Sequence, residues 1–332
     1  MKQLQTSVDC VVTSPPYFSQ RHYGDSPEEF GNEASVREYV NLLVGLFSSI
    51  SLAPWGSVWV NLNDKRGKHG ELLGVPERFL IAMQESGFFL VDKVIWAKEV
   101  LNIDGTANGH CMIDPARHRL NGNGFEYLLR FVKNTKTAWT DLSAIRVPRL
   151  GVEDIRYRPE GLMQCHTSLE GRTPANVWRI PVTRTGLEHY GMFPPALVER
   201  PIAMTCPEFV TEKGPRERIV QWEVYQEKVS GKSRKIGKYS KDSVEMSGRH
   251  DTAREYVPRK PKTVGWTLSD LPREAGTVLD PFAGTSTVGE VAIKLGRRYI
   301  GVELYDKYAD LGVERCNNAT ALLSAHNART KT

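Results

Sequence analysis

The sequence predicts an α/β protein with a mostly parallel sheet and helices on both faces. Short apolar runs rich in β-branched residues alternate along the chain with stretches whose apolar residues recur at helical spacing. A turn of small residues at 283–287 joins one apolar run to one helical stretch. Strands that alternate with helices in this way favour a parallel sheet that is covered on both sides.

Six apolar runs are predicted to be buried strands, and they occur near both ends of the chain and in its first half. They are residues 8–13, 57–62, 88–96, 127–132, 277–279 and 298–304. Residues 36–50 are predicted to form a helix between the first two runs, and residues 287–295 form a second predicted helix after the small-residue turn. Two long stretches, 146–184 and 211–262, lack this periodicity, and loops of such length in a compact domain are usually either functional or disordered.

Composition argues against a membrane protein and against a disulfide-stabilised one. The chain has 332 residues, and its apolar run at 88–96 is interrupted by Asp92 and Lys93, well short of the roughly 20 residues of a transmembrane helix. Its five cysteines are scattered and include no C-x-x-C pair, which argues against a disulfide framework and a structural zinc site. We therefore expect no metal. The N-terminal residues lack the pattern of a secretory signal, so we expect a cytoplasmic protein.

Positive charge is concentrated in one segment of the chain. The net charge is 44 minus 39, or +5, whereas residues 228–262 alone hold 11 Lys or Arg and 4 Asp or Glu, a local charge of +7. The remainder of the chain therefore sums to −2. Such a segment is often a solvated surface, but it also suits a polyanionic partner.

A first candidate site follows the predicted strand 277–279. The chain continues as Asp-Pro-Phe-Ala-Gly-Thr-Ser-Thr at 280–287, and the next strand ends near Glu303, 23 positions after Asp280. Small residues let the backbone turn sharply and approach a ligand, with helix N-terminal amides directed at negative charge. A carboxylate at the end of the next strand is where doubly wound folds hold a ribose diol.

The ligand of this turn is predicted partly from what the motif lacks. It is not G-x-G-x-x-G, as in NAD sites, and it lacks the G-K-[ST] of a nucleoside triphosphate site. S-adenosylmethionine fits better, because it offers ribose hydroxyls and a carboxylate but no pyrophosphate. The alternative, a tight turn that binds no ligand, is less favoured. The predicted cofactor residues here are Asp280, Phe282, Gly284, Thr285 and Glu303.

A second candidate site is the tetrapeptide Ser14-Pro15-Pro16-Tyr17, which follows the predicted strand 8–13 directly. Two prolines fix the backbone and remove two amide donors, so the loop is stiff and offers acceptors. The Ser14 hydroxyl and the Pro15 carbonyl could accept both hydrogens of a planar aromatic amine while its ring stacks on Tyr17.

This arrangement suits methylation of an exocyclic amine. The lone pair of such an amine is conjugated into the ring, and holding both N–H bonds favours a pyramidal nitrogen whose lone pair faces a methyl sulfonium. The transfer is then direct, driven by positioning and electrostatics. A tetrapeptide this short also recurs by chance, so alone it would more often only end a strand.

Together, T-S-P-P-Y at 13–17 and D-P-F-A-G-T-S-T at 280–287 resemble the S-adenosylmethionine-dependent DNA amino-methyltransferases. The order of the motifs, catalytic loop first and cofactor loop last, is similar to the circularly permuted β group. Segments 18–24, 124–133, 176–181 and 189–199 also resemble that family, so the resemblance covers most of the chain. It implies a Rossmann-like fold, and it implies that Phe193 and Pro194 help to enclose the methionine end of the cofactor.

The resemblance also bears on the base that is methylated. In that family, enzymes with a serine at the first position of the tetrapeptide, here Ser14, mainly methylate N4 of cytosine. Enzymes with an aspartate there mainly methylate N6 of adenine. N6-adenine methylation remains the alternative within the enzyme class, and a catalytically inactive DNA-binding protein with the same fold is the alternative outside it. Methylation of protein side chains is disfavoured by Ser14. C5-cytosine methylation is disfavoured because Cys206-Pro207 reverses the Pro-Cys order of its nucleophile.

The resemblance divides the chain into parts with different expected roles. Residues 1–145 form the catalytic half of the methyltransferase domain, and residues 189–210 and 276–320 form the cofactor-binding half. Residues 146–188 are an irregular insertion and a candidate for target recognition, and residues 211–275 are a basic insertion. Double-stranded DNA is the expected partner, with a cognate restriction endonuclease as a further one. We expect the basic insertion to contact DNA phosphates through Lys232, Arg234, Lys235, Lys238 and Lys241.

Overall fold

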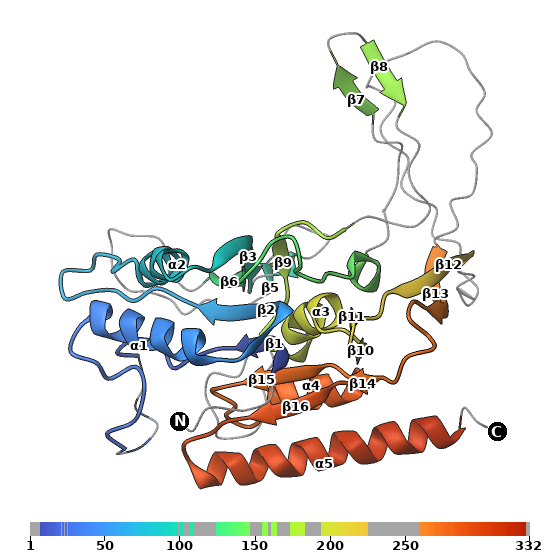
Figure 1. Cartoon of the computed structure of the whole chain (residues 1–332). Coiled ribbons are helices and arrows are strands. Elements are labelled where there is room, and N and C mark those ends of the chain that lie inside the picture. Colours follow the sequence, from blue (N-terminus) through green and yellow to red (C-terminus); the bar gives the residue numbers. More distant parts are fainter. Residues whose placement is uncertain are drawn as a thin grey trace. The chain divides into compact units, whose positions relative to one another are not determined.

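The computed structural model describes residues 7–20, 22, 24, 26–98, 100–101, 107–108, 124–146, 155–158, 161–164, 173–182, 194–224 and 259–329 (Figure 1). The chain divides into two compact units. The first contains residues 1–145, 174–217 and 266–332, and the second contains residues 146–173 and 218–265. The candidate motifs at 13–17 and 280–287 both belong to the first unit.

A seven-stranded sheet forms the centre of the first unit, in the order β16-β15-β1-β2-β6-β3-β9. In chain order its strands are β1 (Val8–Thr13), β2 (Leu52–Leu62), β3 (Phe89–Ala97), β6 (Phe125–Val132), β9 (Val177–Arg179), β15 (Thr277–Asp280) and β16 (Arg298–Gly301). Strand β6 runs antiparallel to both of its neighbours, and the other pairings are parallel. The prediction of a mostly parallel sheet is therefore confirmed.

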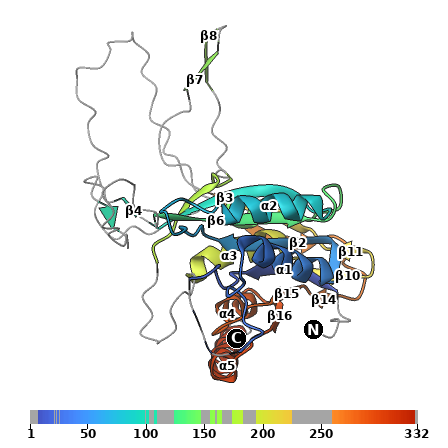
Figure 2. The same ribbon diagram turned by 90° about the vertical axis from the view of Figure 1, so that its left-hand side faces the viewer.

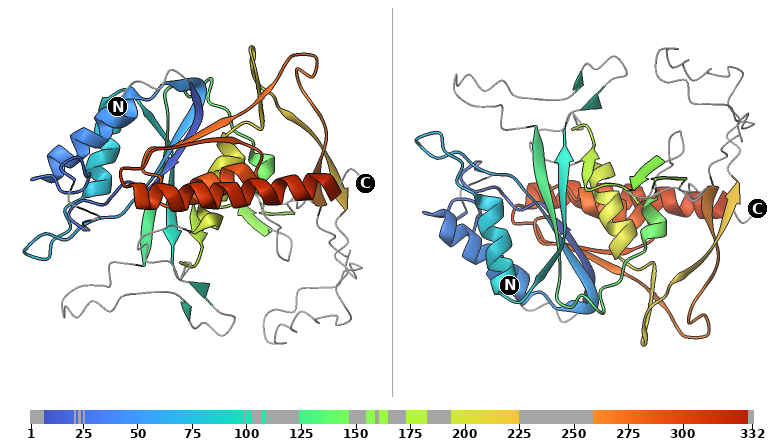
Figure 3. Two further views of the ribbon diagram at one scale, coloured as in Figure 1. Left: turned by 90° about the horizontal axis from the view of Figure 1, so that it is seen from below. Right: turned by 90° about the horizontal axis from the view of Figure 1, so that it is seen from above.

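Helices cover both faces of this sheet, as predicted. In chain order they are α1 (Val36–Ser49), α2 (Val75–Glu85), α3 (Pro195–Thr205), α4 (Thr287–Lys294) and α5 (Asp306–Arg329). Helices α1 and α2 pack together on one face, whereas α3 and α4 cover the other, with α5 against α4. Figure 2 shows α1 and α2 lying alongside each other, and Figure 3 shows the long red α5 crossing the first unit.

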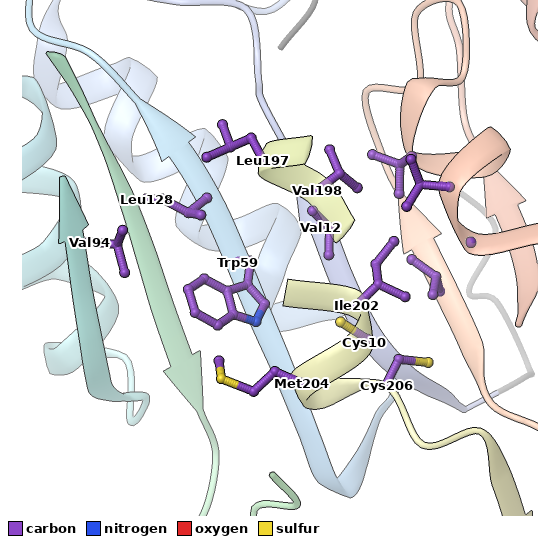
Figure 4. Close-up of a cluster of buried hydrophobic side chains, with 14 of the residues drawn as sticks. Cys10, Val12, Trp59, Val94, Leu128, Leu197, Val198, Ile202, Met204 and Cys206 are labelled. Atoms are coloured by element: carbon purple, nitrogen blue, oxygen red, sulfur yellow. The ribbon is translucent and has the colours of Figure 1, made fainter. Parts of the chain in front are cut away.

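Alternation of side chains along the strands produces two separate cores. On β2, Trp59 points to the face of α3 and α4, whereas Val58 and Val60 point to the face of α1 and α2. The α3 side is drawn in Figure 4, where the Trp59 ring lies among Leu128, Ile202 and other apolar side chains. Period-two alternation with both faces apolar is what a sheet between two helical layers requires.

Local sequence explains where the helices begin. The Ser35 side chain accepts a hydrogen bond from the Glu38 amide and so caps α1. The Asp64 carboxylate accepts from the amides of Gly74 and Val75 at the start of α2. These bonds satisfy amides that the first helical turn leaves without a partner.

The smaller sheets lie outside the central one. In the first unit β10 (Phe209–Thr211) pairs with β11 (Gly214–Pro215) and β14 (Glu274–Ala275), and β4 (Val100–Leu101) pairs with β5 (Ala107–Asn108). The described residues of the second unit form two ribbons. These are β7 (Ile155–Arg158) with β8 (Gly161–Gln164), and β12 (Arg218–Val224) with β13 (Arg259–Trp266). Among the described helices, none combines the length and apolarity of a membrane span.

The structure extends and corrects several predicted elements. Strand β2 begins at Leu52, five residues before the predicted start, and β16 ends at Gly301, so Glu303 lies just beyond the strand. Helices α2, α3 and α5 fall in stretches for which the preceding analysis gives no helix. Helix α3 begins at Pro195 and contains Pro201 in its interior, where a proline weakens a helical pattern in the sequence.

Candidate active site

The two candidate motifs begin side by side, although they are far apart in the sequence. Strands β1 and β15 are parallel neighbours, with Cys10 opposite Val278 and Val11 opposite Leu279. At their carboxyl ends, the hydroxyl Oγ1 of Thr13 donates a hydrogen bond to Oδ1 of Asp280 over 2.6 Å. Both side chains are buried. The tetrapeptide and the small-residue turn therefore leave the same edge of the sheet at adjacent strands.

The tetrapeptide is fixed in place by its surroundings. Pro15 is buried, and the carbonyl of Pro16 accepts a hydrogen bond from the Tyr39 hydroxyl over 2.8 Å. Gly31 has a φ of +98° and lies close under the loop, where a β-carbon would come within 3.1 Å of the Tyr17 carbonyl oxygen. Such a close approach with positive φ favours glycine. Two elements thus support the shape that the prolines impose.

The Tyr17 hydroxyl reaches a polar cluster at the ends of the neighbouring strands. It donates to Oε2 of Glu126 over 2.7 Å, with Oδ1 of Asn61 at 3.2 Å. The other Glu126 oxygen, Oε1, accepts from Nζ of Lys98 over 2.6 Å. Burial, and then the nearby Glu126, raise the pKa of Tyr17 well above its ordinary value. The phenol therefore keeps its proton and remains a donor.

The small-residue turn is held by the end of β16. The Gly284 amide donates to Oε2 of Glu303 over 2.7 Å, and the Tyr305 amide donates to Oε1 over 3.0 Å. The Phe282 amide donates to Oδ1 of Asp280 over 3.1 Å. Gly284 has a φ of +51°, which glycine tolerates without strain. Glu303 therefore lies against the turn, where a ribose-binding carboxylate was expected.

Asp280 has an unusual acidity for a carboxyl group. Burial raises its pKa from 3.8 to about 7, while the hydrogen bonds from Thr13 and from the Phe282 amide act in the opposite direction. The nearby Glu303 raises the pKa further. At pH 7 the carboxyl is therefore about half protonated, so Asp280 carries less negative charge beside the turn than an ordinary aspartate does.

The loop that follows the tetrapeptide contacts the segments that follow β15 and β16. The Tyr305 hydroxyl donates to Oε2 of Glu29 over 2.8 Å, and the rings of Phe30 and Phe282 meet edge to face at 5.0 Å. Gly24 lies under Tyr305, so closely that a β-carbon would come within 2.4 Å of its ring. The loop after the tetrapeptide and the turn after β15 therefore form one structure.

The structure brings most of the predicted site residues to one edge. Ser14, Pro15, Pro16 and Tyr17 leave β1, and Asp280, Phe282 and Gly284 leave β15 beside them. Thr285 is buried at the start of α4, within reach of Arg315, and Pro194 is buried at the start of α3. Phe193 and the predicted DNA-binding residues lie outside the described residues: Lys232, Arg234, Lys235, Lys238 and Lys241.

Sequence reasoning missed the residues that support the site, namely Thr13, Asn61, Lys98 and Glu126, together with Glu29 and Tyr305. A usable signal existed only for Lys98, which lies just after a predicted strand, where polar residues gather at the carboxyl edge of a parallel sheet. Glu126 lies just before another predicted strand, and a parallel sheet would place it at the opposite edge. Nothing in the sequence indicates that β6 is antiparallel, which is what brings Glu126 to that edge.

The described residues supply neither a cysteine nucleophile nor a metal site. The Cys206 thiol is fully buried at the end of α3, and burial raises its pKa well above the ordinary value, so it does not supply a thiolate nucleophile. Across the part of the chain that the structure describes, no three His, Cys, Asp or Glu side chains gather closely enough to hold a metal ion.

Comparison with known proteins identifies the family. The profile of a family described as DNA methylase, which covers N6 and N4 enzymes, matches residues 8–213 and 231–314. The chain belongs to this N6/N4 DNA methylase family. Among its relatives is the type II methyltransferase M.Cfr9I of Citrobacter freundii, which is 24% identical over 339 residues, or 93% of this chain and 81% of that protein.

One further relative in sequence and one solved structure are also similar to this methylase. The type II methyltransferase M.SmaI of Serratia marcescens is 24% identical over 337 residues, which cover 92% of this chain and 83% of that protein. The solved PvuII DNA methyltransferase (cytosine-N4-specific) is 17% identical, with a TM-score of 0.53 over 96% of this chain and 85% of that chain. The structural likeness supports the Rossmann-like methyltransferase fold.

As a member of this methylase family, the protein uses S-adenosylmethionine as its methyl donor, and the described residues fit it chemically. The Glu303 carboxylate beside the turn suits ribose hydroxyls, and Phe282 offers an apolar ring next to it. The raised pKa of Asp280 lessens its repulsion of the carboxylate at the methionine end. The turn lacks the lysine that a polyphosphate would require.

Proposed function

We propose that this DNA methylase transfers the methyl group of S-adenosylmethionine to the N4 amine of a cytosine turned out of double-stranded DNA. One observation carries the proposal. The hydrogen bond between Thr13 and Asp280 joins the ends of β1 and β15, so an amine bound at the tetrapeptide faces a ligand bound at the turn. A reaction between two bound molecules needs this proximity above all.

The tetrapeptide supplies what the amine requires. The Ser14 hydroxyl and the Pro15 carbonyl accept the two N–H hydrogens, and the Tyr17 ring stacks on the base. The Pro16 carbonyl accepts from Tyr39 already, so we assign the amine to Ser14 and Pro15. Both contacts grow stronger as positive charge develops on the nitrogen, which lowers the barrier for transfer. When bound, the cofactor supplies the electrophilic methyl group, and solvent takes the amine proton afterwards.

Cytosine is proposed as the target because serine heads the tetrapeptide. The resemblance that links Ser14 to N4-cytosine agrees with the name of the PvuII enzyme, which is cytosine-N4-specific and has a similar fold. An amine inside a duplex is out of reach of Ser14, so the base must be flipped at a cost of a few kcal/mol. We assign part of the compensating phosphate contact to the basic insertion at 211–275, with residues 146–188 as a second candidate for target recognition.

The cellular setting is also part of the proposal. Several relatives are named type II methyltransferases, and such enzymes are paired with a restriction endonuclease that recognises the same DNA sequence. We therefore propose a cytoplasmic modification enzyme with a cognate endonuclease as its genetic partner.

Product analysis tests the proposed function. Duplex DNA is incubated with the protein and S-adenosylmethionine labelled in the methyl group, and the DNA is then digested to nucleosides. The expected labelled product is N4-methylcytosine. Labelled N6-methyladenine alone would overturn the choice of base, and an absence of labelled nucleosides would favour a DNA-binding protein without activity.

A further inference from the structure

Helix α5 packs directly against the small-residue turn at 283–287. Figure 1 and Figure 2 both show it alongside α4, the helix that begins at this turn. Two residues of α5, Gly312 and Arg315, contact the turn itself. They are three positions apart and therefore lie on the same face of the helix. The turn is thus held from the side of α5 as well as by Glu303 at the end of β16.

Gly312 provides the space that the Ser286 side chain occupies. A β-carbon on Gly312 would lie 2.5 Å from Oγ and 3.2 Å from Cβ of Ser286, whereas its next neighbour, the Gly284 carbonyl oxygen, would be at an ordinary 3.5 Å. Ser286 has a φ of +56°, a left-handed conformation that is costly for a residue with a β-carbon. Its side chain makes no capping hydrogen bond to α4 and is buried against α5 instead. This arrangement of Ser286 therefore requires a glycine at position 312.

Arg315 fixes the residues on both sides of Ser286. Its Nη1 donates to Oγ1 of Thr287 over 3.0 Å and lies 3.5 Å from both the carbonyl oxygen and Oγ1 of Thr285. Its Nε donates to Oε2 of Glu290, which lies about one turn further along α4. A guanidinium group has a rigid fork of donors, so one side chain holds several acceptors at once. The turn and the start of α4 are thereby joined to α5.

We propose that Gly312 and Arg315 are positioning residues that hold the turn at 283–287 in the shape that binds S-adenosylmethionine. They act through residues 284–287 and do not need to touch the cofactor. A turn that leaves its binding shape binds the cofactor with an affinity reduced by the fraction of molecules that keep that shape. The inference rests on the proposed placement of the cofactor at this turn and is independent of the choice of base.

A pair of size changes tests the contact between α5 and the turn. Gly312→Ala is expected to raise the Kd for S-adenosylmethionine, measured by calorimetry, roughly 10- to 100-fold, because the new methyl group must displace Ser286. Ser286→Gly removes the atoms that this methyl group would meet, and glycine tolerates the positive φ. The double variant should therefore bind within about threefold of Ser286→Gly alone, the coupling expected of two residues in contact.

Arg315→Ala tests the second contact and should raise the same Kd roughly 10- to 100-fold, the effect of losing hydrogen bonds from a charged group. The matched control is Arg78→Ala, because Arg78 also donates to a backbone carbonyl, that of Leu73, but belongs to α2 on the other face of the sheet. Gly45→Ala is the control for the glycine, since a β-carbon there meets nothing within 4 Å. Both controls should leave the Kd unchanged.

The binding measurements are made where circular dichroism shows each variant to be folded. A folded Gly312→Ala variant with the wild-type Kd, or a double variant that binds no better than Gly312→Ala, would overturn the proposal. If Gly312→Ala fails to fold, an unchanged Kd in Arg315→Ala would overturn it instead.

Binding of the cofactor is measured without DNA, so the outcome is separate from that of the proposed function. A wild-type protein that bound S-adenosylmethionine but methylated only adenine, or no base at all, would contradict the proposed function alone. The expected pattern of Kd values in the variants would then still support the role of Gly312 and Arg315.

Discussion

Thr13 and Asp280 are separated by 267 positions in the sequence, yet their side chains share a buried hydrogen bond of 2.6 Å. The bond lies at the carboxyl ends of two parallel strands, β1 and β15, which lead into the tetrapeptide and the small-residue turn. It joins the strand that leads to the proposed base-binding groups to the strand that leads to the proposed cofactor-binding groups.

The first prediction concerns the buried Asp280 carboxyl. Its folded pKa of about 7 lies above the value near 4 of an unfolded chain, so the folded state retains a proton that the unfolded state has lost. The free energy of unfolding should therefore fall as the pH rises from about 4 to about 7, by about 1.4 kcal/mol for each pKa unit of difference. Asp280→Asn should remove this part of the slope.

Urea unfolding at a series of pH values checks this. Asp310→Asn, which changes an exposed carboxyl on α5, serves as the matched control and should leave the slope unchanged. Parallel stability curves for the wild type and Asp280→Asn would show that the carboxyl is ionised in the folded protein.

The second prediction concerns the head of the tetrapeptide. Ser14→Ala removes an acceptor that the proposal directs at the target amine, and we expect the rate of methyl transfer to fall by about 100-fold or more. Binding of S-adenosylmethionine and of DNA, measured by calorimetry and by fluorescence anisotropy, should change little. The control is Ser49→Ala on the exposed side of α1. An equal loss of both binding affinities would mean that Ser14 has a structural role.

The third prediction concerns the basic insertion. Replacing four of its residues by alanine should weaken DNA binding and lower the slope of log affinity against log salt by about 0.9 for each phosphate that the variant no longer neutralises. The four are Lys232, Arg234, Lys235 and Lys238. The exposed Lys136 and Lys213 provide a control pair. An unchanged salt slope would assign the phosphate contacts to another part of the chain.

The fourth prediction compares two glycines. A β-carbon on Gly276, just before β15, would lie 2.2 Å from the Pro207 carbonyl oxygen, whereas one on Gly45 in α1 would meet nothing within 4 Å. Gly276→Ala should therefore lower the free energy of unfolding by about 1–3 kcal/mol. Gly45→Ala should raise it by roughly 1 kcal/mol, because alanine favours the helix. Equal effects in chemical denaturation would contradict the close packing of β15 against the end of α3.

The sequence was sufficient to predict the two strands that lead into the candidate motifs. Strand β1 occupies residues Val8–Thr13 as predicted, and β15 begins at Thr277 as predicted, because both are short apolar runs that end at a distinctive motif. It was not sufficient to predict helix α3, since the interior Pro201 opposes a helix whose stability comes from packing on the sheet. Tertiary burial outweighs local propensity there.

The supporting residues of the site were harder to foresee than the motifs. Glu126 and Lys98 belong to β6 and to the end of β3, and only the pairing of these strands brings their side chains to Tyr17. Strand direction depends on connections through residues far apart in the chain, and apolar periodicity carries no information about it. Motifs could therefore be recognised from the sequence, whereas the hydrogen bonds that orient them required the structure.

The central claim is that a methyl donor at the turn after β15 faces an amine at Ser14. A crystal structure with a duplex target and sinefungin, in which an amine replaces the methyl sulfonium, tests it most directly. We predict that the amine of the flipped base lies within hydrogen-bond distance of Ser14 and about 3–3.5 Å from the sinefungin amine. A base bound away from Ser14, or sinefungin bound away from the turn at 280–287, would contradict the account.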